Sequence, residues 1–168
     1  MQTWARLGAY GAALTAAMAT VTTFEITNAT ADGATTVALQ ASLRRCDAST
    51  IVAAPQVPRV GLGSGTALIR TSGSTVSAEV NLVDQNQPGT HFDVGLIEVP
   101  RPSSATCGPG DPGTAYAGLD TDAAGRGTVT IQEGIQQGAK GAWVIIQRPN
   151  PNSQNPAEFY TSEFVAPI

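Results

Sequence analysis

Hydrophobic and polar residues alternate along much of the chain from residue 21 onward. The clearest run is TVSAEVNLV (75–83), whose apolar positions are Val76, Ala78, Val80 and Leu82. Alternation with a period of two places the apolar side chains on one face of a β-strand and the polar ones on the other. The run HFDVGLIEV (91–99) has the same pattern. Both segments therefore predict strands with one face in a hydrophobic core.

Further short runs predict strands before and after these two. They are VTTFEIT (21–27), TTVALQASL (35–43), AYAGL (115–119), TVTIQ (128–132), AWVIIQ (142–147) and FYTSEFV (159–165). A short helix is an alternative for 35–43. The four residues from Trp143 to Ile146 are apolar at every position, so both faces of that strand are expected to be buried in the middle of a sheet.

The segments between these runs are rich in glycine, proline, asparagine and serine and predict loops. They are GLGSG (61–65), DQNQPGT (84–90), PRPSSATCGPGDPGT (100–114) and RPNPNSQNPAE (148–158). About eight short antiparallel strands joined by such loops predict an all-β fold, a two-sheet antiparallel sandwich with immunoglobulin-like Greek-key connections. We expect one such domain over residues 21–168, preceded by a separate N-terminal segment over residues 1–20.

Composition and charge indicate what kind of domain the chain forms and which partners it is not expected to bind. The chain has 168 residues, of which 42% are hydrophobic, and it contains 18 glycines and 11 prolines. This is the composition of a globular, turn-rich domain rather than a disordered chain. The net charge is −4, and the nine lysines and arginines are scattered singly. A chain without a basic stripe does not attract a phosphate backbone, so we expect no nucleic-acid partner.

The two cysteines, Cys46 and Cys107, are too far apart in the sequence for a CxxC redox or zinc motif. We predict that they form one disulfide, which closes a loop of about 60 residues and implies an oxidising compartment. Two buried free thiols are the alternative.

The N-terminus has features of a secretory signal peptide. Arg6 is followed by a run of alanine, glycine and leucine with small residues at Ala17 and Ala19, a spacing typical of cleavage sites. The apolar run is too short to span a bilayer, so we expect no membrane span and a secreted or cell-surface protein. The alternative is a retained helix or arm that packs against a neighbouring subunit. Asn28 begins the only N-glycosylation triplet and is a candidate glycan site.

The stretch LDTDAAGRGTVTI (119–131) begins like a calcium-binding EF-hand loop. Counting from Asp120 places Asp122 at position 3, but Ala124 at position 5 and Ile131 at position 12. The fifth and twelfth positions of such a loop supply oxygen ligands, and the loop lies between two helices. We therefore predict a β-hairpin turn, in which the aspartates cap the backbone and two glycines, Gly125 and Gly127, adopt positive φ.

His91 is the only histidine, so a metal site built from several imidazoles cannot form. His91, Asp93 and one of the serines can be drawn as a hydrolytic triad. The two residues share one strand face, however, and no G-x-S-x-G motif follows a strand. GLGSG lacks the strand-to-helix setting of a phosphate-binding loop. We therefore predict no catalytic residue, no cofactor and no metal ligand.

The C-terminal part of the chain carries five motifs in a fixed order. They are PGTHFDVGLIEVP, CGPGDPG, TDAAGRGTVTI, GAWVIIQ and AEFYTSEFVAPI. With these motifs, residues 74–168 resemble small secreted immunoglobulin-like β-sandwich proteins of actinobacteria. The resemblance implies fold and export and brings no activity with it. The antibody pattern itself is missing, because Trp143 follows both cysteines instead of lying between them.

These observations predict a non-enzymatic secreted or cell-surface β-sandwich that acts as a structural or assembly subunit or as a binding module. As an assembly subunit it would form a homo-oligomer by donating the segment MATVTTFEIT (18–27) to a neighbour's sheet edge. As a binding module it would hold a protein or glycan ligand on the loops GPGDPG (108–113) and PNPNSQNP (149–156). The alternative is a small secreted hydrolase or metal-dependent enzyme that uses His91, Asp93 and Asp120.

Overall fold

A computed structural model describes residues 33–51 and 61–168 of the chain. In these ranges the regular structure consists of nine β-strands, and all neighbouring strands are antiparallel. They are β1 (Ala34–Gln40), β2 (Ser64–Ser72), β3 (Thr75–Val83), β4 (His91–Val99), β5 (Thr114–Asp120), β6 (Arg126–Gly134), β7 (Gly141–Arg148), β8 (Glu158–Ser162) and β9 (Ala166–Pro167). The all-β prediction is confirmed for the described residues.

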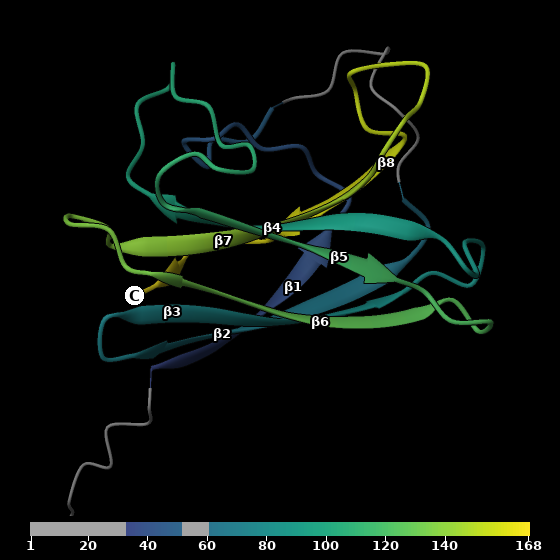
Figure 1. The fold of residues 1–168 in the computed structure, drawn as a ribbon, viewed down its shortest axis with the longest axis horizontal. Helices are drawn as coiled ribbons and strands as arrows, with labels where there is room; N and C mark the ends of the chain where they lie inside the picture. The colour runs from purple at the N-terminus through teal and green to yellow at the C-terminus, as the bar shows by residue number, and fades with distance from the viewer. Residues whose placement is uncertain (1–32, 52–60) are drawn as a thin grey trace, which may run out of the picture.

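Hydrogen bonds join the strands into one sheet in the order β5-β4-β7-β8-β1-β2-β3-β6, with β9 paired to β7. The sheet curls round on itself, so that β4, β5 and β7 lie over β2, β3 and β6 (Figure 1). The short pairing of β1 with β8 joins these two halves. The sheet is thus nearly closed, with β5 and β6 as its two edges. The predicted immunoglobulin-like, two-sheet character stays a prediction.

The strongest alternations in the sequence match their strands, since β3 and β4 cover the predicted ranges 75–83 and 91–99. The helical alternative for 35–43 is wrong, because β1 covers most of that range. The predicted strand at 159–165 ends early, because β8 stops at Ser162, a bend follows, and β9 begins only at Ala166. β2 was not predicted, and its first residues fall in the predicted loop 61–65. The predicted strand at 21–27 lies outside the described residues.

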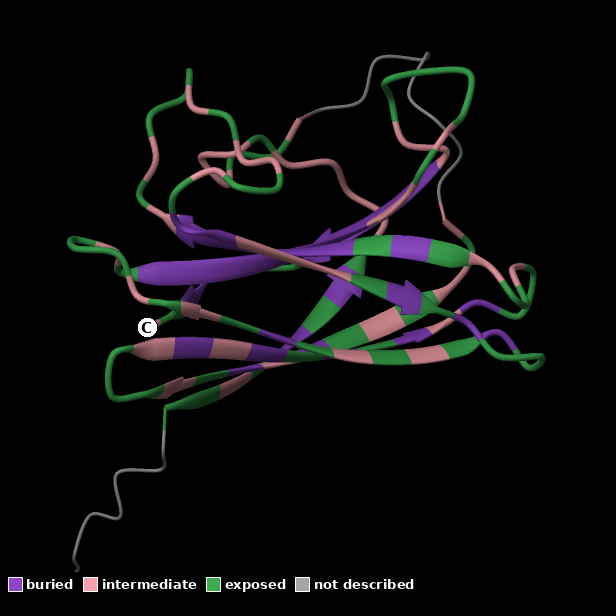
Figure 2. Cartoon of the chain, viewed as in Figure 1, coloured by how far each residue is buried: buried purple, intermediate pink, exposed green. Residues whose placement is uncertain are grey.

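The core lies between the two halves of the curled sheet. The four apolar residues of the 75–83 alternation are buried, and their polar neighbours Glu79 and Asn81 are exposed. Figure 2 shows this alternation along β3 and continuous burial along β7. Removing apolar side chains from water stabilises the fold by about 1.5–3 kcal/mol for each fully buried large one.

Strand β7 has hydrophobic surroundings on both faces. Val144 and Ile146 belong to the main core. Trp143 and Ile145 point the other way and form a second cluster with Ile97 of β4. β7 lies between β4 and β8 in the sheet, which confirms the prediction of a central strand. The second cluster lies under the loops that carry the two cysteines, because Ala48 and Cys107 pack against it.

Candidate functional site

The two cysteines form the predicted disulfide. Cys46 and Cys107 are bonded, with their Cα atoms 5.5 Å apart and a sequence separation of 61. The bond ties the segment after β1 to the loop between β4 and β5. The phenol of Tyr116 on β5 donates a hydrogen bond of 2.6 Å to the carbonyl of Cys107. Both contacts hold the cysteine-containing loops against the outer face of β4 and β7.

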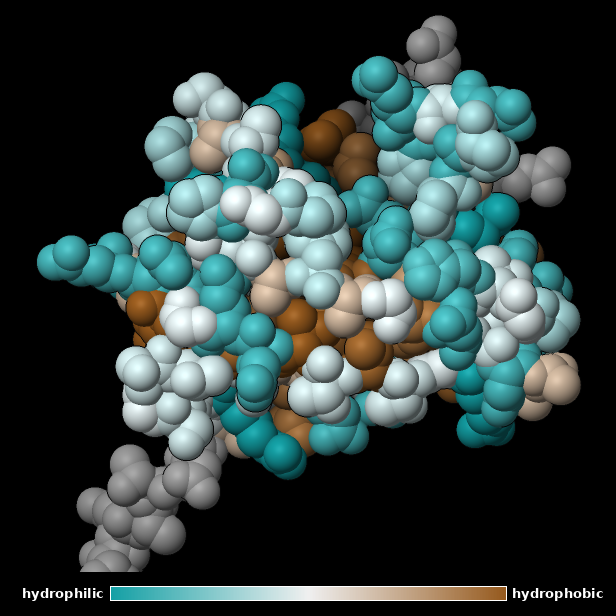
Figure 3. All heavy atoms as spheres, viewed as in Figure 1, coloured by the Kyte–Doolittle hydropathy of each residue, from teal (hydrophilic) through white to brown (hydrophobic). Residues whose placement is uncertain are grey.

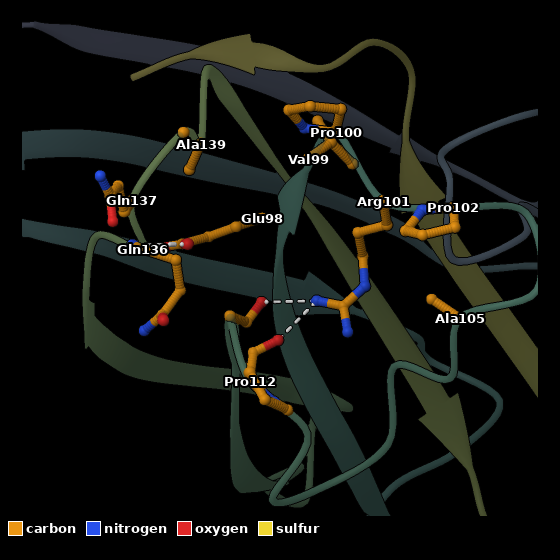
Figure 4. Close-up of a pocket in the computed structure, with 12 residues that line it drawn as sticks. Glu98, Val99, Pro100, Arg101, Pro102, Ala105, Pro112, Gln136, Gln137 and Ala139 are labelled. Atoms are coloured by element: carbon orange, nitrogen blue, oxygen red, sulfur yellow. Dashed lines mark hydrogen bonds between the residues drawn. The ribbon is translucent and has the colours of Figure 1, made fainter.

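A pocket of about 450 Å³ opens beside this loop, between the residues that follow β4 and the turn that joins β6 to β7 (Figure 4). Three prolines, Pro100, Pro102 and Pro112, line it together with small apolar side chains. Its polar lining comes from Glu98, Arg101, Gln136 and Gln137. The predicted loop 108–113 thus contributes to a real cavity, whereas the loop 149–156 does not line it.

The charged side chains of the pocket bind the backbone of its own walls. Arg101 donates from Nη1 to the carbonyls of Pro112, at 2.7 Å, and Gly113, at 3.3 Å, and from Nη2 to that of Thr106, at 2.7 Å. The carboxylate of Glu98, which is 3% exposed, accepts a bond of 2.9 Å from the backbone N–H of Gln136. These bonds fix the shape of the pocket, and its three prolines are exposed.

A second carboxyl lies close to Glu98. Burial, and then the negative charge of Glu98, raise the pKa of Glu133 near the end of β6. Oε1 of Glu98 and Oε2 of Glu133 are both buried without a hydrogen-bond partner among the described residues. Glu133 therefore binds a proton more readily than an exposed carboxyl group would.

The residues of the predicted alternative active site meet on the surface. His91 begins β4 and lies opposite Asp120 of β5, with Nδ1 at 2.7 Å from Oδ1 of Asp120. Its Nε2 lies 3.4 Å from Oδ1 of Asp93. The ring passes over Gly118, where any side chain would collide with it. The hydrogen bond from the His91 ring to Asp120 is the main reason that the pKa of His91 is raised.

This Asp–His–Asp group holds a proton more tightly than a free imidazole does, because the pKa of His91 is raised. A hydrolase would also need a nucleophile, and no serine, threonine or cysteine of the described residues forms a hydrogen bond with His91. In the same ranges no three His, Cys, Asp or Glu side chains are grouped in a way that could hold a metal ion. The group is half exposed and lies on an open strand face. His91→Ala remains the variant that tests the hydrolase alternative.

The stretch at 119–131 forms a tight turn between β5 and β6, but the predicted β-hairpin is wrong, because β5 pairs with β4 and β6 pairs with β3. Oδ1 of Asp122 accepts hydrogen bonds from the backbone N–H groups of Ala124, at 2.8 Å, and Arg126, at 2.9 Å. These bonds lower the pKa of Asp122. Gly125 has φ +73, as predicted, and a Cβ there would collide with the carbonyl oxygen of Asp84. The aspartate therefore serves the backbone of the turn.

One detail of that prediction is wrong. Gly127 does not adopt positive φ. A Cβ at Gly127 would instead collide with the side chain of Leu119, which packs across the start of β6. The glycine is required by a close approach between β5 and β6 and not by the backbone angle.

A buried acidic cluster joins the ends of β3 and β8, and sequence reasoning missed it. The hydroxyl of Tyr160, a buried residue of β8, contacts Oε1 of Glu158 and lies 3.1 Å from Oδ2 of Asp84. Both acids are buried, Asp84 at 1% and Glu158 at 5% exposure. The backbone N–H of Gly63 donates to the same hydroxyl at 2.9 Å. Arg148 lies 3.4 Å from Glu158 on the outer side.

The cluster must hold a proton on one of its two carboxyl groups, in addition to the hydroxyl hydrogen of Tyr160. The hydroxyl of Tyr160 has a single hydrogen and approaches two carboxyl groups, so one carboxyl must itself be protonated for both contacts to be hydrogen bonds. Burial is the main cause that raises the pKa of Glu158. The spacing of Glu158 and Tyr160, two positions apart on one strand, signals that they share a face. Nothing in the sequence signals that Asp84 joins them.

The two edges of the sheet face each other. β5 and β6 are joined by a turn but form no ladder with each other. Ala115 and Ala117 of β5 and Val129 of β6 are only partly buried there, although they pack against the main core. The described part of the chain therefore leaves an apolar strip between two unpaired strand edges.

Two predicted features lie outside the described residues. They are the segment 1–20, interpreted as a signal peptide, and the candidate glycan site Asn28.

The described residues thus define an all-β, antiparallel protein with one disulfide, a loop pocket and two open edges. In these ranges every regular element is a strand, so no helix there is long and apolar enough to cross a membrane. Comparisons of the chain with protein-family models, curated proteins and solved structures find no match.

Proposed function

We propose that the chain is a non-enzymatic, secreted or cell-surface protein of immunoglobulin-like sandwich type that works as an assembly subunit. The observation that carries this proposal is the pair of unpaired edge strands, β5 and β6, at the two ends of the sheet. Unpaired N–H and C=O groups along a strand are a template for another strand. The disulfide is consistent with export to an oxidising compartment.

The two edges lack the usual protection against pairing. Natural edge strands carry inward-pointing charges, proline or bulges that stop another chain from adding to them. β5 has no proline and no charge before Asp120, and β6 has none between Arg126 and Glu133. Each edge thus has six consecutive uncharged residues, and those of β6 include threonine and valine, which suit an added strand.

The oligomeric state of the protein tests the proposal. Light scattering after gel filtration is measured for the full chain and for variants that lack residues 1–20 or 1–27. We expect oligomers for the full chain and for the shorter deletion, and a monomer once residues 21–27 are also removed. A full chain that stays monomeric at all concentrations would rule out assembly. A variant with 149–156 exchanged for Gly-Ser is the control and should assemble normally.

The pocket favours a second function, that of a binding module with a glycan or protein ligand. It is preformed, it presents prolines and amide side chains, and the disulfide holds its rim. On a glycan array, exchange of 108–113 for Gly-Ser should abolish binding, whereas exchange of 149–156 should leave it intact. Equal binding by both exchanged variants would count against the pocket as the ligand site.

A further inference from the structure

The pocket between the residues that follow β4 and the turn from β6 to β7 has a buried acid in its lining. Glu98 lines this pocket and is only 3% exposed. Its Oε2 accepts one hydrogen bond, of 2.9 Å, from the backbone N–H of Gln136, whereas its Oε1 has no partner among the described residues. A buried carboxylate oxygen without a donor lowers stability. Glu98 is therefore a strong acceptor for a ligand that brings a donor of its own.

A second carboxyl adds negative charge beside Glu98. Oε2 of Glu133 is likewise buried without a partner among the described residues. Burial, followed by the charge of Glu98, raises the pKa of Glu133, and a cation near the two acids would relieve that repulsion. Arg101 is close by, but in the described ranges no ion pair joins it to either acid, and its Nη atoms donate to backbone carbonyls. With both carboxyls ionised, one negative charge exceeds that of Arg101, and a cationic ligand would neutralise it.

The free acceptors suit an ammonium group better than other cations. A guanidinium pairs best with both oxygens of one carboxylate, but Oε2 of Glu98 already holds the N–H of Gln136. An ammonium has several N–H donors that point in different directions and reach acceptors on separate residues. Gln136 and Gln137 line the pocket and carry further amide oxygens. The acids do not make a metal site, because no third His, Cys, Asp or Glu of the described residues joins them.

The rest of the lining suits an aliphatic chain attached to that ammonium. Pro100, Pro102 and Pro112 are exposed and border the pocket (Figure 4). An apolar proline surface accommodates methylene groups better than a sugar ring, whose hydroxyls would need partners on every side. Nε of Arg101 is a buried donor without a partner among the described residues, and a peptide carbonyl would satisfy it. A lysine side chain within a peptide has all three features, an ammonium, an apolar stem and a neighbouring carbonyl.

We propose that the pocket binds the lysine side chain of a partner protein, with the ammonium against Glu98 and the stem against the prolines. This inference rests on the second proposed function, that of a binding module, and names its ligand as a protein. The volume of about 450 Å³ lies within the range of ligand pockets. Lys140, the only lysine of this chain, is exposed and does not line the pocket, so the bound lysine comes from another molecule.

An NMR titration of the isotope-labelled full chain tests the inference with two probes that differ in one group. They are Nα-acetyl-lysine methylamide and Nα-acetyl-norleucine methylamide, which lacks the ammonium. We expect the lysine probe to shift the backbone amide signals of Gly113 and Gln136 and to bind about tenfold or more tightly than the norleucine probe. The Gln136 amide reports on the site directly, because it donates to Glu98.

Variants that remove one charge test the role of the acids. Glu98→Gln keeps the shape of the side chain and should weaken binding of the lysine probe by about tenfold or more. Glu133→Gln, at a less buried position, should weaken it as well and serves if Glu98→Gln does not fold. Glu79→Gln, at an exposed position of β3, is the matched control and should bind like the parent chain.

The remaining outcomes separate the inference from the proposed function. Equal binding of the lysine and norleucine probes, or unchanged binding by the folded Glu98 and Glu133 variants, would overturn the ammonium site. Tighter binding of glucosamine than of the lysine probe at the same amides, or glycan-array binding that depends on 108–113 without any response to the lysine probe, would overturn lysine as the ligand and leave the binding module standing. No response to any probe and no array binding that depends on 108–113 would overturn both.

Discussion

His91 illustrates how a single residue gains chemistry from the fold. The sequence placed it beside Asp93 on one strand, but the stronger partner is Asp120, which lies opposite it on β5. The two carboxylates stabilise the protonated imidazole, so the pKa of His91 lies above its ordinary value, chiefly because of the bond to Asp120. The group is half exposed, and solvent therefore screens part of this effect.

The titration of His91 can be followed directly, because it is the only histidine in the chain. In an NMR titration we expect a pKa above the usual value of about 6.5. Asp120→Asn should lower that pKa towards 6.5, and Asp93→Asn should lower it less. The stability that this group contributes is present below about pH 6.5 and is lost as the pH rises through the folded-state pKa. An equal effect of both variants would contradict the assignment of Asp120 as the main partner.

The Asp84, Glu158 and Tyr160 cluster reverses the usual behaviour of a carboxyl group. Burial raises the pKa of Glu158 above 4.5, so the folded chain holds this proton more tightly than the unfolded chain does. The resulting stability is fully present below the unfolded value and is lost as the pH rises through the folded-state value. Arg148, 3.4 Å away, opposes part of that loss by favouring the charged form.

Glu158→Gln should therefore flatten the dependence of stability on pH. Glutamine keeps a polar side chain of similar shape but carries no charge at any pH. In urea unfolding between pH 4 and 8, we expect the free energy of unfolding of the parent chain to fall relative to that of the variant as the pH rises. Glu163→Gln, at an exposed position just beyond β8, is the control and should follow the parent chain. If the free energies of unfolding of the parent chain and of Glu158→Gln changed in parallel with pH, this would contradict a proton held on Glu158.

At the scale of strands, the sequence predicted an element best where large apolar residues alternate without interruption. β3 and β4 have four or more buried apolar positions each, and their ends fall where predicted. β2 was missed because its buried positions are only Ala67 and Ile69 and because its start, Ser64 and Gly65, has the composition of a loop. β2 forms because its backbone pairs with β1 on one side and β3 on the other, and its own sequence has no strong strand pattern.

The candidate sites were less predictable than the strands, because they join residues from distant strands. The Cys46–Cys107 pair could be predicted, since no other partner exists for either cysteine. The pocket and the acidic cluster could not, because Glu98 and Asp84 find their partners Gln136 and Tyr160 on elements far away in the sequence. The order of strands in the sheet depends on the whole chain, so no short stretch of sequence indicates it.

The turn between β5 and β6 gives a test at this scale. Gly125 has φ +73 and lies against the backbone of Asp84, whereas Gly73 has φ +58 and open space around it. Gly125→Ala should cost about 3 kcal/mol or more, because strain and collision add, and Gly73→Ala only about 1 kcal/mol from strain alone. Urea unfolding measures both. Equal costs would show that the contact with Asp84 contributes nothing.

For the whole molecule, the disulfide connects the segment after β1 to the loop between β4 and β5. The loops carrying Cys46 and Cys107 cover the second cluster of Trp143, Ile145 and Ile97 on the outer face of the sheet. Cys107 packs against this second cluster, and neither cysteine is among the residues packed against the main core. The molecule therefore has one core held by strand pairing and a smaller one held by a covalent link across 61 positions.

Replacing both cysteines by serine should distinguish the stability of the main core, held by strand pairing, from that of the second cluster, held by the disulfide. Loss of a loop closure of this length is expected to cost about 4 kcal/mol on the chain-entropy estimate. The β-sheet circular-dichroism signal should survive at low temperature, because the main core is intact, while the fluorescence of Trp143 shifts to the red as its cluster opens to water. A Trp4→Phe background isolates that signal, since the chain has two tryptophans. An unshifted spectrum in the double serine variant would mean that packing alone holds the loops over Trp143, and that the covalent link adds stability only through the unfolded chain.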